Sequence, residues 1–499
     1  MTTRLELVCA LGIDLGTSGI KVVALSPKGR ILATAREPYR TIAACEGQAE
    51  QDCGDWLKAL TRAVNHIQQK SIRKLPVKAI AVTGQMPTLV VLNGGKPLGH
   101  AITWQDTRAE SWTSERMNAE LRHDVYRRTG VHIDGRYLAP MYGFHRKRSR
   151  KRDVILSAKD FLLYALTGVT ATDPSTASGY GLYNLESGAW DTRLCEFWNI
   201  SADQLPSIRA SSFSLLLNRS GAKLLRCASD TPVLVGCADS AAGVYALNGS
   251  APANDTVTIL TGSSTVIIKS DSRPTWDGRS RFLLTPLAVE HTYGQEADLL
   301  ASGSARDWVQ NLLAGNNSKP RRLLWQSARE IAPGANGLLF APYLAGGEQG
   351  ILWNPNLKGA LIGLTWAHGP GHIARALLEG MSFEIRRCIE ALEDKPITSV
   401  RITGWMAENA ADLQILADIL GRPVHAFKLK SASATGAALF TGLVDQQSYF
   451  DQMKASVFKP TVTNSPCYNE VYARYIARFP AKSSAKLTAV AKESSHRAR

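Results

Sequence analysis

Two short segments combine glycine with hydroxyl side chains, as phosphate-binding turns do. They are residues 12–19, Gly-Ile-Asp-Leu-Gly-Thr-Ser-Gly, and residues 261–265, Thr-Gly-Ser-Ser-Thr. Such turns present backbone N–H groups and hydroxyls with little side-chain bulk, so a phosphate chain can approach closely. Asp14, in the first segment, has a carboxylate that could hold a magnesium ion through water. The alternative is an ordinary hairpin with Asp14 as a turn residue. The second segment favours phosphate binding, because two such turns can hold a triphosphate between them.

An aspartate at the end of a predicted strand is the second chemical candidate. Residues 232–236, Pro-Val-Leu-Val-Gly, form a short apolar run, and small residues follow Asp239 in a predicted helix. A carboxylate with small neighbours can approach a substrate alcohol and act as its general base. The alternative is structural, because an aspartate at a helix start commonly caps the first turn. The residues alone leave both roles open for Asp239.

The elements that must position these residues follow an α/β pattern. Residues 11–26 alternate as a β-hairpin, and residues 31–36 predict a third strand. Residues 55–70 have apolar side chains at helical spacing, and residues 77–83 predict a buried strand. Strands followed by a helix and another strand indicate an α/β fold with an antiparallel start. A further helix is predicted at residues 159–166.

The opening pattern recurs near the middle of the chain. Residues 257–269 again predict a strand, a glycine and hydroxyl turn, and a strand that ends in a lysine. Two copies about half a chain apart suggest duplication of one domain. Glycine, serine and proline cluster at residues 248–254, which places the predicted domain boundary there.

Length and composition limit the class of protein. A chain of 499 residues predicts two or three domains, and its net charge of +15 suits an anionic ligand. The same charge would also suit nucleic acid or an acidic membrane surface. The 8 cysteines are scattered, which predicts free thiols in a reducing compartment. Neither a signal peptide nor a membrane-spanning stretch is recognisable, so we expect a cytoplasmic protein without a membrane partner.

Other patterns carry less weight. His368 and His372 have the i, i+4 spacing of metal ligands, but Gly-Pro-Gly lies between them and should prevent the helix that this spacing requires. The chain has no Walker A sequence, dinucleotide fingerprint, Gly-x-Ser-x-Gly elbow or zinc-ligand set. The basic run at residues 146–152 has no interleaved aromatic residues, so we interpret it as a solvated loop and do not expect nucleic-acid binding.

Further segments, taken in order with the two turns, resemble the motifs of the FGGY carbohydrate kinases over nearly the whole chain. They are residues 50–52 followed by Trp56, 84–86 (Gly-Gln-Met), 104–108 (Trp-Gln-Asp-Thr-Arg), 159–162 (Lys-Asp-Phe-Leu), 166–168 (Leu-Thr-Gly), 342–344 with Gly347 and Glu348, 359–365, and 374–380 (Ala-Arg-Ala-Leu-Leu-Glu-Gly). Each motif alone is loose, but so many in the family's order are specific.

The resemblance implies an α/β fold of two ribonuclease H-like (actin-like ATPase) domains, with the sugar and ATP in a cleft between them. It places an N-terminal domain at residues 1–248, on the sugar side, with the first phosphate turn and the catalytic aspartate. A C-terminal domain at residues 249–480 is expected on the nucleotide side, followed by a basic flexible tail at 481–499. The implied activity is ATP-dependent phosphorylation of a small sugar, with D-xylulose and D-xylulose 5-phosphate as the expected substrate and product. Another ketose or a polyol, such as ribulose or glycerol, is the alternative substrate.

The resemblance also carries site roles onto matching positions. Asp239 falls where the family has its catalytic base and Asp14 on its magnesium-associated aspartate, so both are expected to serve a Mg²⁺ site. The residues expected to contact ATP are Asp14, Thr17, Ser18, Lys21, Gly262, Ser263, Gly303, Gly404, Ala407 and Asn409. The residues expected to contact the sugar are Gln85, Met86, Pro87, Trp104, Asp106, Asp239 and Ser240.

Several positions depart from the family pattern. Its adenine loop is usually Gly-Gly-Gly-Ala, but residues 404–407 are Gly-Trp-Met-Ala, and residues 261–263 are Thr-Gly-Ser where Gly-Thr-Ser is usual. Pro87 and Ser240 stand where members that phosphorylate xylulose have histidine and asparagine. A rival of another class is therefore a sugar- or nucleotide-binding regulator with weakened turnover, although Asp14 and Asp239 favour an active enzyme. The choice of sugar stays open, as does the oligomeric state, for which a homodimer is one assembly that the sequence allows.

Overall fold

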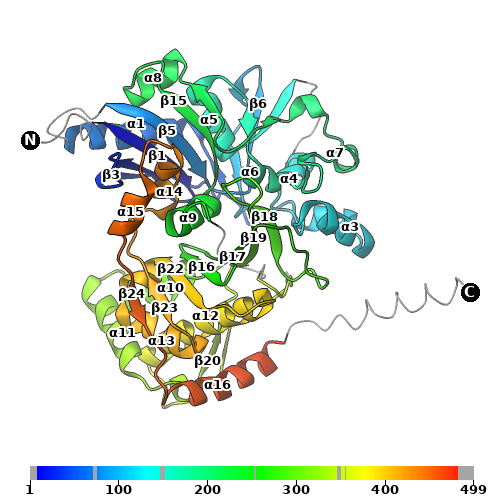
Figure 1. Ribbon diagram of the computed structural model, residues 1–499. Coiled ribbons are helices and arrows are strands. Elements are labelled where there is room, and N and C mark those ends of the chain that lie inside the picture. Colours follow the sequence, from blue (N-terminus) through cyan, green and yellow to red (C-terminus); the bar gives the residue numbers. More distant parts are fainter. Residues whose placement is uncertain are drawn as a thin grey trace, which may run out of the picture. The chain divides into compact units, whose positions relative to one another are not determined.

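The computed structural model describes residues 8–70, 76–145, 152–251, 254–345, 350–354 and 356–480. They fall into two compact units, coloured along the chain in Figure 1. The N-terminal unit comprises Met1–Asn254, Ile268–Glu296 and Leu429–Lys454, and the C-terminal unit comprises Asp255–Ile267, Ala297–Lys428 and Ala455–Arg499. Residues 146–151 of the basic run, Gly347 and Glu348, and the predicted tail at 481–499 lie outside the described residues.

A six-stranded sheet with the order β14-β15-β5-β1-β2-β3 forms the centre of the N-terminal unit. Strands β1 (Cys9–Gly16), β2 (Gly19–Leu25) and β3 (Ile31–Pro38) are antiparallel to one another. Strand β1 runs parallel to β5 (Val77–Gly84), which runs parallel to β15 (Pro232–Ala238), and β14 (Ser214–Leu216) closes the edge. Because β1, β5 and β15 are parallel, their carboxyl ends meet at the same edge of the sheet, and the residues that follow them lie close together.

Helices cover both faces of this sheet. Leu11 and Ile13 of β1 belong to a core with Trp56 of α1 (Cys53–Lys70) and Leu162 of α5 (Ala158–Thr167). On the other face α14 (Ala432–Phe440) packs on β1 and on α9 (Asp239–Asn248). A Cβ atom on Gly12 would stand 1.8 Å from the carbonyl oxygen of Ala434, so the close approach of α14 requires glycine there.

Smaller elements complete the N-terminal unit. A second sheet contains β4 (Glu50–Gln51), β6 (Thr88–Asn93), β7 (Lys96–Pro97), β8 (Ala101–Thr103) and β9 (Asp153–Ser157). The further helices are α2 (Glu110–Arg116), α3 (Ala119–Thr129), α4 (Leu138–His145), α6 (Pro174–Ser178), α7 (Thr192–Trp198), α8 (Arg219–Leu225) and α15 (Gln446–Gln452). The further strands are the pairs β10 (Ala171–Thr172) with β13 (Ser207–Ile208), β11 (Tyr183–Asn184) with β12 (Ala189–Trp190), and β18 (Leu283–Pro286) with β19 (Tyr293–Leu299).

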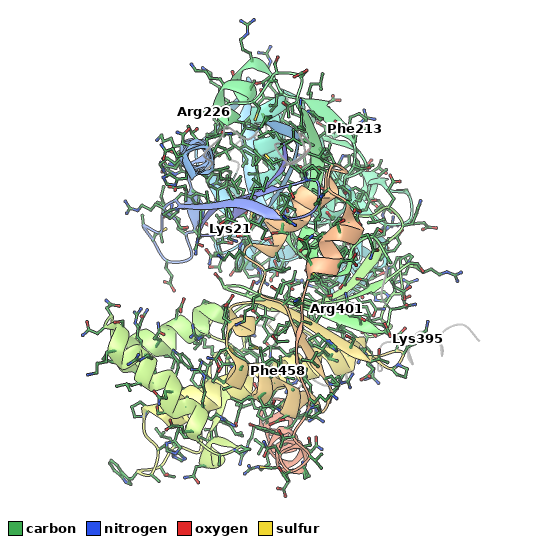
Figure 2. All side chains as sticks on the ribbon, turned by 60° about the vertical axis from the view of Figure 1, so that its left-hand side comes forward. Lys21, Phe213, Arg226, Lys395, Arg401 and Phe458 are labelled. Carbon is green, nitrogen blue, oxygen red and sulfur yellow. The ribbon has the colours of Figure 1, made fainter. Side chains whose placement is uncertain are left out.

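The C-terminal unit contains three parallel strands. Strand β16 (Thr256–Thr261) pairs with β22 (Ser399–Gly404), which pairs with β23 (Val424–Ala426), and β24 (Ser456–Phe458) is antiparallel to β23. Figure 2 labels Arg401 on β22 and Phe458 on β24. The turn at 262–264 leads from β16 into β17 (Thr265–Asp271), and β20 (Leu339–Ala341) pairs with β21 (Ala360–Ile362). Its helices are α10 (Gly303–Ala314), α11 (Ser318–Glu330), α12 (Pro370–Leu392), α13 (Ala410–Leu420) and α16 (Ser465–Arg478).

The structure confirms the elements predicted around the two turns, including the strands before and after each turn and the strand and helix on either side of Asp239. None of the eight cysteines, all of which lie within the described ranges, forms a disulfide, as expected. His372 lies in the first turn of α12, whereas His368 precedes that helix, so the two histidines do not form a helical pair. No helix runs through both histidines, as the Gly-Pro-Gly segment led us to expect. Pro370 instead begins α12, because proline needs no N–H partner at the first helical position. None of the helices within the described ranges has the length and hydropathy that crossing a bilayer requires.

Candidate active site

Asp14 lies near the end of β1, directly opposite Lys21 of β2. Its side chain is 2% exposed, and the Lys21 ammonium donates to Oδ2 at 3.0 Å. The charge of Asp14 is the main cause that raises the pKa of Lys21. Within the described residues, the other oxygen, Oδ1, is buried and accepts no hydrogen bond from the protein. Lys21, labelled in Figure 2, therefore neutralises one oxygen and leaves the other as a lone acceptor.

The first turn is held in place by side chains around it. Thr17 accepts two hydrogen bonds. Trp104 Nε1 donates to its hydroxyl at 3.0 Å, and Gln51 Nε2 donates to its carbonyl oxygen at 2.8 Å. Ser18 is exposed, and its hydroxyl accepts from the Arg36 guanidinium at 3.1 Å. The turn is thus preorganised, with one hydroxyl directed by an indole and one close to a cation.

Asp239 is the first residue of α9, at the end of β15. Helix α9 has Ala238 at its N-cap and no side-chain cap, so the capping role considered for Asp239 is not seen. Among the described residues, its Oδ1 accepts only from the adjacent N–H of Ser240, at 2.9 Å. The half-buried carboxyl has a pKa raised to about 7, first through loss of water and then through the negative charge of Asp14, while Lys21 opposes the rise. A carboxylate of this pKa suits a general base near neutral pH.

The strand register brings the two aspartates to one edge of the sheet. Asp14 of β1 and Cys237 of β15 both lie opposite Thr83 of the intervening strand β5. Strands in a sheet are about 4.8 Å apart, so the backbones of β1 and β15 are separated by roughly 10 Å at this point. Asp239 follows Cys237 by two residues.

The segment predicted to contact the sugar continues from β5, between the two aspartates. The backbone N–H of Gln85 donates to the carbonyl of Leu15 at 2.9 Å, and its side chain donates to Gln51 at 3.0 Å. Met86 and Pro87 follow, joined by a cis peptide bond, and the thioether of Met86 packs against Gly179. The structure therefore brings these three predicted residues together with Asp14 and Asp239.

Trp104 and Asp106 occupy supporting positions. Trp104 donates to Thr17, as described above. Asp106 is buried, and both of its oxygens accept bonds from Arg108, while Oδ2 also accepts from the N–H of Ala49 at 3.0 Å. These partners direct Asp106 into the protein, so its observed contacts hold the loop before α2 in place. Ser240 is half-buried and sits beside Asp239 at the start of α9.

The second turn, in the C-terminal unit, leads directly to a helix N-terminus. Gly262 and Ser263 are exposed, and the N–H groups of Gly303 and Ser304 donate to their carbonyl oxygens at 3.2 Å and 3.1 Å. Gly303 begins α10, whose N-terminus favours an anion. A Cβ atom on Gly303 would stand 2.3 Å from the Gly262 carbonyl oxygen, so this contact requires glycine. The structure thus brings the exposed residues Gly262 and Ser263 of the turn together with the half-buried Gly303 at the start of α10.

The altered loop at 404–409 borders the same turn. Gly404 has φ of 96°, and a Cβ atom there would meet the Thr261 carbonyl oxygen at 1.9 Å. Ala407 is buried, and Asn409 caps α13 by accepting from the N–H groups of residues 411 and 412. Trp405 is half-buried and packs on the core of the unit, and Gly303 lies beside its Nε1. In this loop, therefore, bulky side chains pack at positions where the family pattern has glycines.

Two features of these sites were not found from the sequence. Arg306 of α10 lies between two indoles, 4.7 Å from the ring centre of Trp325 and 5.2 Å from that of Trp405. A buried ion cluster around Lys159 lies beneath β15. In the sequence, the adjacent residues Lys159 and Asp160 are recognisable only as part of a family motif. Their residue types do not indicate which strand their side chains support.

The residues present fit a magnesium ion that is held by one or two carboxylates together with water and substrate phosphates. Within the described ranges, no three His, Cys, Asp or Glu side chains are grouped as metal ligands. Mg²⁺ is usually bound by one or two carboxylates together with water and substrate phosphates, so a three-residue cage is not required. The buried Oδ1 of Asp14, which has no donor among the described residues, is the kind of oxygen that such an ion would use.

Comparison with known proteins agrees with this geometry. The model of the N-terminal domain of the FGGY family of carbohydrate kinases matches residues 9–246, and that of the C-terminal domain matches residues 257–443. The fold is the two-domain, ribonuclease H-like fold of actin-like ATPases, as predicted. The chain belongs to the FGGY family of carbohydrate kinases, and it is a sugar kinase.

The relatives carry several substrate names. A xylulose kinase of Staphylococcus epidermidis is 28% identical over 497 residues, covering 96% of this chain and 97% of the relative. A glycerol kinase of Gloeobacter violaceus is 30% identical over 448 residues, covering 87% of each chain. The crystal structure of a gluconate kinase from Lactobacillus acidophilus has a TM-score of 0.85 at 25% identity, covering 96% of this chain and 99% of that one. The reaction class is therefore shared, whereas the acceptor differs among the relatives.

Proposed function

We propose that this kinase transfers the γ-phosphoryl group of ATP to D-xylulose and forms D-xylulose 5-phosphate. The observation that carries the proposal is the Asp239 carboxyl, with a pKa of about 7, at the end of β15 beside the segment of Gln85, Met86 and Pro87. The similarity to xylulose kinases supports the choice of a ketose.

The charge around Asp239 favours a neutral acceptor. The carboxylates of Asp14 and Glu296 both raise the pKa of Asp239, so this part of the N-terminal unit already carries excess negative charge. An aldonate such as gluconate would bring a further carboxylate, which like-charge repulsion disfavours. A ketose or a polyol brings only hydroxyls, and the relatives include kinases of both kinds of neutral substrate.

In the proposed mechanism Asp239 accepts the proton of the substrate hydroxyl as the oxygen attacks the γ-phosphorus. Lys21 places positive charge beside Asp14, and the turns at 16–19 and 262–264 supply backbone N–H groups and hydroxyls for the phosphates. Gly303, at the start of α10, adds a helix N-terminus. We propose that Asp14, with Asp239, holds Mg²⁺, which would neutralise charge on the phosphates. Catalysis of this kind depends mainly on positioning and charge stabilisation.

A panel of D-xylulose, D-ribulose, glycerol and gluconate, assayed for ATP-dependent ADP release, tests the substrate. We expect D-xylulose to have the highest kcat/KM and gluconate the lowest. Asp239→Asn should reduce turnover by about 10²- to 10⁴-fold. A higher kcat/KM for gluconate would contradict the charge interpretation, and full activity of Asp239→Asn would remove the assignment of the base.

A regulator that binds sugar or nucleotide with weakened turnover is the second candidate. The packing of Trp405 and Met406 into the adenine loop favours it, because bulky side chains stand where the family pattern has glycine. Under this alternative the panel would show sugar or nucleotide binding by calorimetry without ADP release.

A further inference from the structure

Three fully buried ionisable side chains lie beneath the strand that carries Asp239. The Lys159 ammonium is 2.9 Å from the Asp160 carboxylate and 3.1 Å from that of Asp173, and each of the three residues is at most 1% exposed. Taking ions out of water costs free energy that replacement by apolar side chains would avoid. The proposed reaction makes no direct use of these groups, because none of them is accessible to a substrate.

Hydrogen bonds connect this cluster to the backbone of β15 at two points. Lys159 Nζ donates to the carbonyl oxygen of Val235 at 2.9 Å. The N–H of Ala238, directly before Asp239, donates to Ser175 Oγ at 2.9 Å. The Ser175 hydroxyl in turn donates to Oδ2 of Asp173. A continuous chain of contacts thus runs from Lys159 through Asp173 and Ser175 to the N–H that precedes Asp239.

Strand β15 needs this support because it is irregular there. Its register with β5 shifts between Leu234 and Cys237, and Gly236 has φ of 73° with no room for a Cβ atom, which would stand 1.7 Å from the Val82 carbonyl oxygen. Such a bulge interrupts the ladder and changes the direction of the residues that follow. The N–H of Gly236 donates to the Ser211 carbonyl at 2.9 Å, so other segments take up the bonds that the ladder does not provide.

We propose that Lys159, Asp173 and Ser175 are positioning residues, which hold the bulged end of β15 and so fix the direction of the Asp239 carboxyl. The inference rests on the proposed role of Asp239 as the base. A displacement of about 1 Å at a reacting group can cost about 10²-fold in rate, even when the substituted residue lies away from the chemistry. The cluster thereby acts on the catalytic step and not on substrate binding.

Ser175→Ala tests the proposal, with Ser211→Ala as its matched control. Both serine hydroxyls donate to Oδ2 of Asp173, Ser211 at 3.3 Å, but only Ser175 accepts from the N–H of Ala238. We expect Ser175→Ala to lower kcat by about 10- to 100-fold with little change in KM for sugar or ATP. Ser211→Ala should keep kcat within about twofold, because it leaves the carbonyl that accepts from Gly236 in place and removes only a hydroxyl that makes no bond to β15. Ser175→Thr, which retains the hydroxyl, should restore most of the turnover.

Amide hydrogen exchange gives a readout that needs no substrate. The N–H of Ala238 should exchange faster in Ser175→Ala than in the wild type and in Ser211→Ala. If Ser175→Ala does not fold, Ser175→Cys replaces it, since a thiol of similar size is a poor acceptor. Unchanged kcat in a folded Ser175→Ala protein, or equal losses in Ser175→Ala and Ser211→Ala, would overturn the proposal. Absence of turnover by the wild type on every sugar would instead refute the proposed function, and hydrogen exchange would still decide whether Ser175 fixes the end of β15.

Discussion

At the scale of single residues, Asp239 combines accessibility with an unusual proton affinity. Its carboxyl is half-buried and, within the part of the chain that the structure describes, receives one hydrogen bond, from the N–H of Ser240. Loss of water and the charge of Asp14 together raise its pKa to about 7, against 3.8 for an ordinary aspartate. A base of this strength is largely unprotonated just above neutral pH and still takes a proton readily.

The first prediction concerns the pH dependence of activity. Only the deprotonated form of Asp239 can accept the substrate proton, so kcat/KM should rise about tenfold per pH unit below pH 7 and level off above it. Steady-state rates at saturating ATP between about pH 5 and pH 9 would measure the profile. A plateau that extends down to about pH 5 would contradict the raised pKa.

Stability gives an independent check on the same group. Because the pKa of Asp239 is higher in the folded protein than the ordinary value of 3.8, the folded state binds this proton more tightly, and the resulting stabilisation is lost as pH rises from about 4 to about 7. Asp239→Asn removes the charge that has to be buried. It should therefore melt at a higher temperature than the wild type at pH 8, with a smaller difference at pH 5. The opposite order would indicate that the charged carboxylate is stabilised in the fold.

At the scale of elements, periodicity and turn composition predicted five strands of the central N-terminal sheet, β1, β2, β3, β5 and β15, and the helices α1, α5 and α9. The alternation of residues 11–26 predicted the β1–β2 hairpin, and the apolar run before Asp239 predicted β15. Each of these elements depends on residues that are neighbours in the chain, so the sequence pattern is sufficient to predict it. The position of Asp14 beside Asp239 depends on the order β15-β5-β1, which no single segment encodes.

Contacts between distant residues explain what the sequence did not predict. The sequence predicts Gly236 only as part of a strand. In the structure this position must be glycine, because a Cβ atom would collide with the carbonyl of Val82, a residue more than 150 positions away in the chain. Asp106 was expected to contact the sugar, whereas its oxygens bind Arg108 and the N–H of Ala49. Whether it also reaches a sugar stays a prediction. Residue type alone cannot distinguish a carboxylate directed into the protein from one directed at a substrate.

A further prediction concerns the loop between β22 and α13. Trp405 packs on the core of the C-terminal unit, with Arg306 over its ring and Gly303 beside its indole nitrogen. Trp405→Gly should lower the free energy of unfolding by about 2–4 kcal/mol, because a large, partly buried ring is lost. ATP affinity, measured by calorimetry, should change by less than about threefold. Trp405→Phe is the control that keeps an aromatic ring and should keep most of the stability.

Two other outcomes for Trp405→Gly would indicate a different role for the Trp405 indole. Weaker ATP binding by about 1–3 kcal/mol with unchanged stability would indicate stacking on the adenine. Tighter binding with unchanged stability would indicate that the indole obstructs the base.

At the scale of the whole molecule, the repeated strand, turn and strand gives each unit one phosphate-type turn. In the N-terminal unit the turn follows β1 and has an aspartate and a lysine beside it, Asp14 and Lys21. In the C-terminal unit the turn follows β16 and leads to the N-terminus of α10. The first turn thus combines both signs of charge, whereas the second relies on backbone dipoles. This difference fits the proposed division of roles between domains 1–248 and 249–480, with the acceptor on the first and the nucleotide on the second.

The last prediction follows from the net charge of the chain. A protein of charge +15 attracts a polyanion such as ATP over long distances and exerts no such attraction on a neutral sugar. The Debye length falls from about 30 Å at 0.01 M salt to about 10 Å at 0.1 M, so added salt should remove most of this attraction. We therefore expect kcat/KM for ATP to fall several-fold as KCl rises from about 10 mM to about 200 mM. The value for D-xylulose at saturating ATP should change by less than about twofold, because a neutral acceptor gains nothing from the field. Steady-state kinetics at constant pH and excess Mg²⁺ would measure both, and an equal loss for the two substrates would show that salt acts on the fold or on the chemical step instead of on the encounter with ATP.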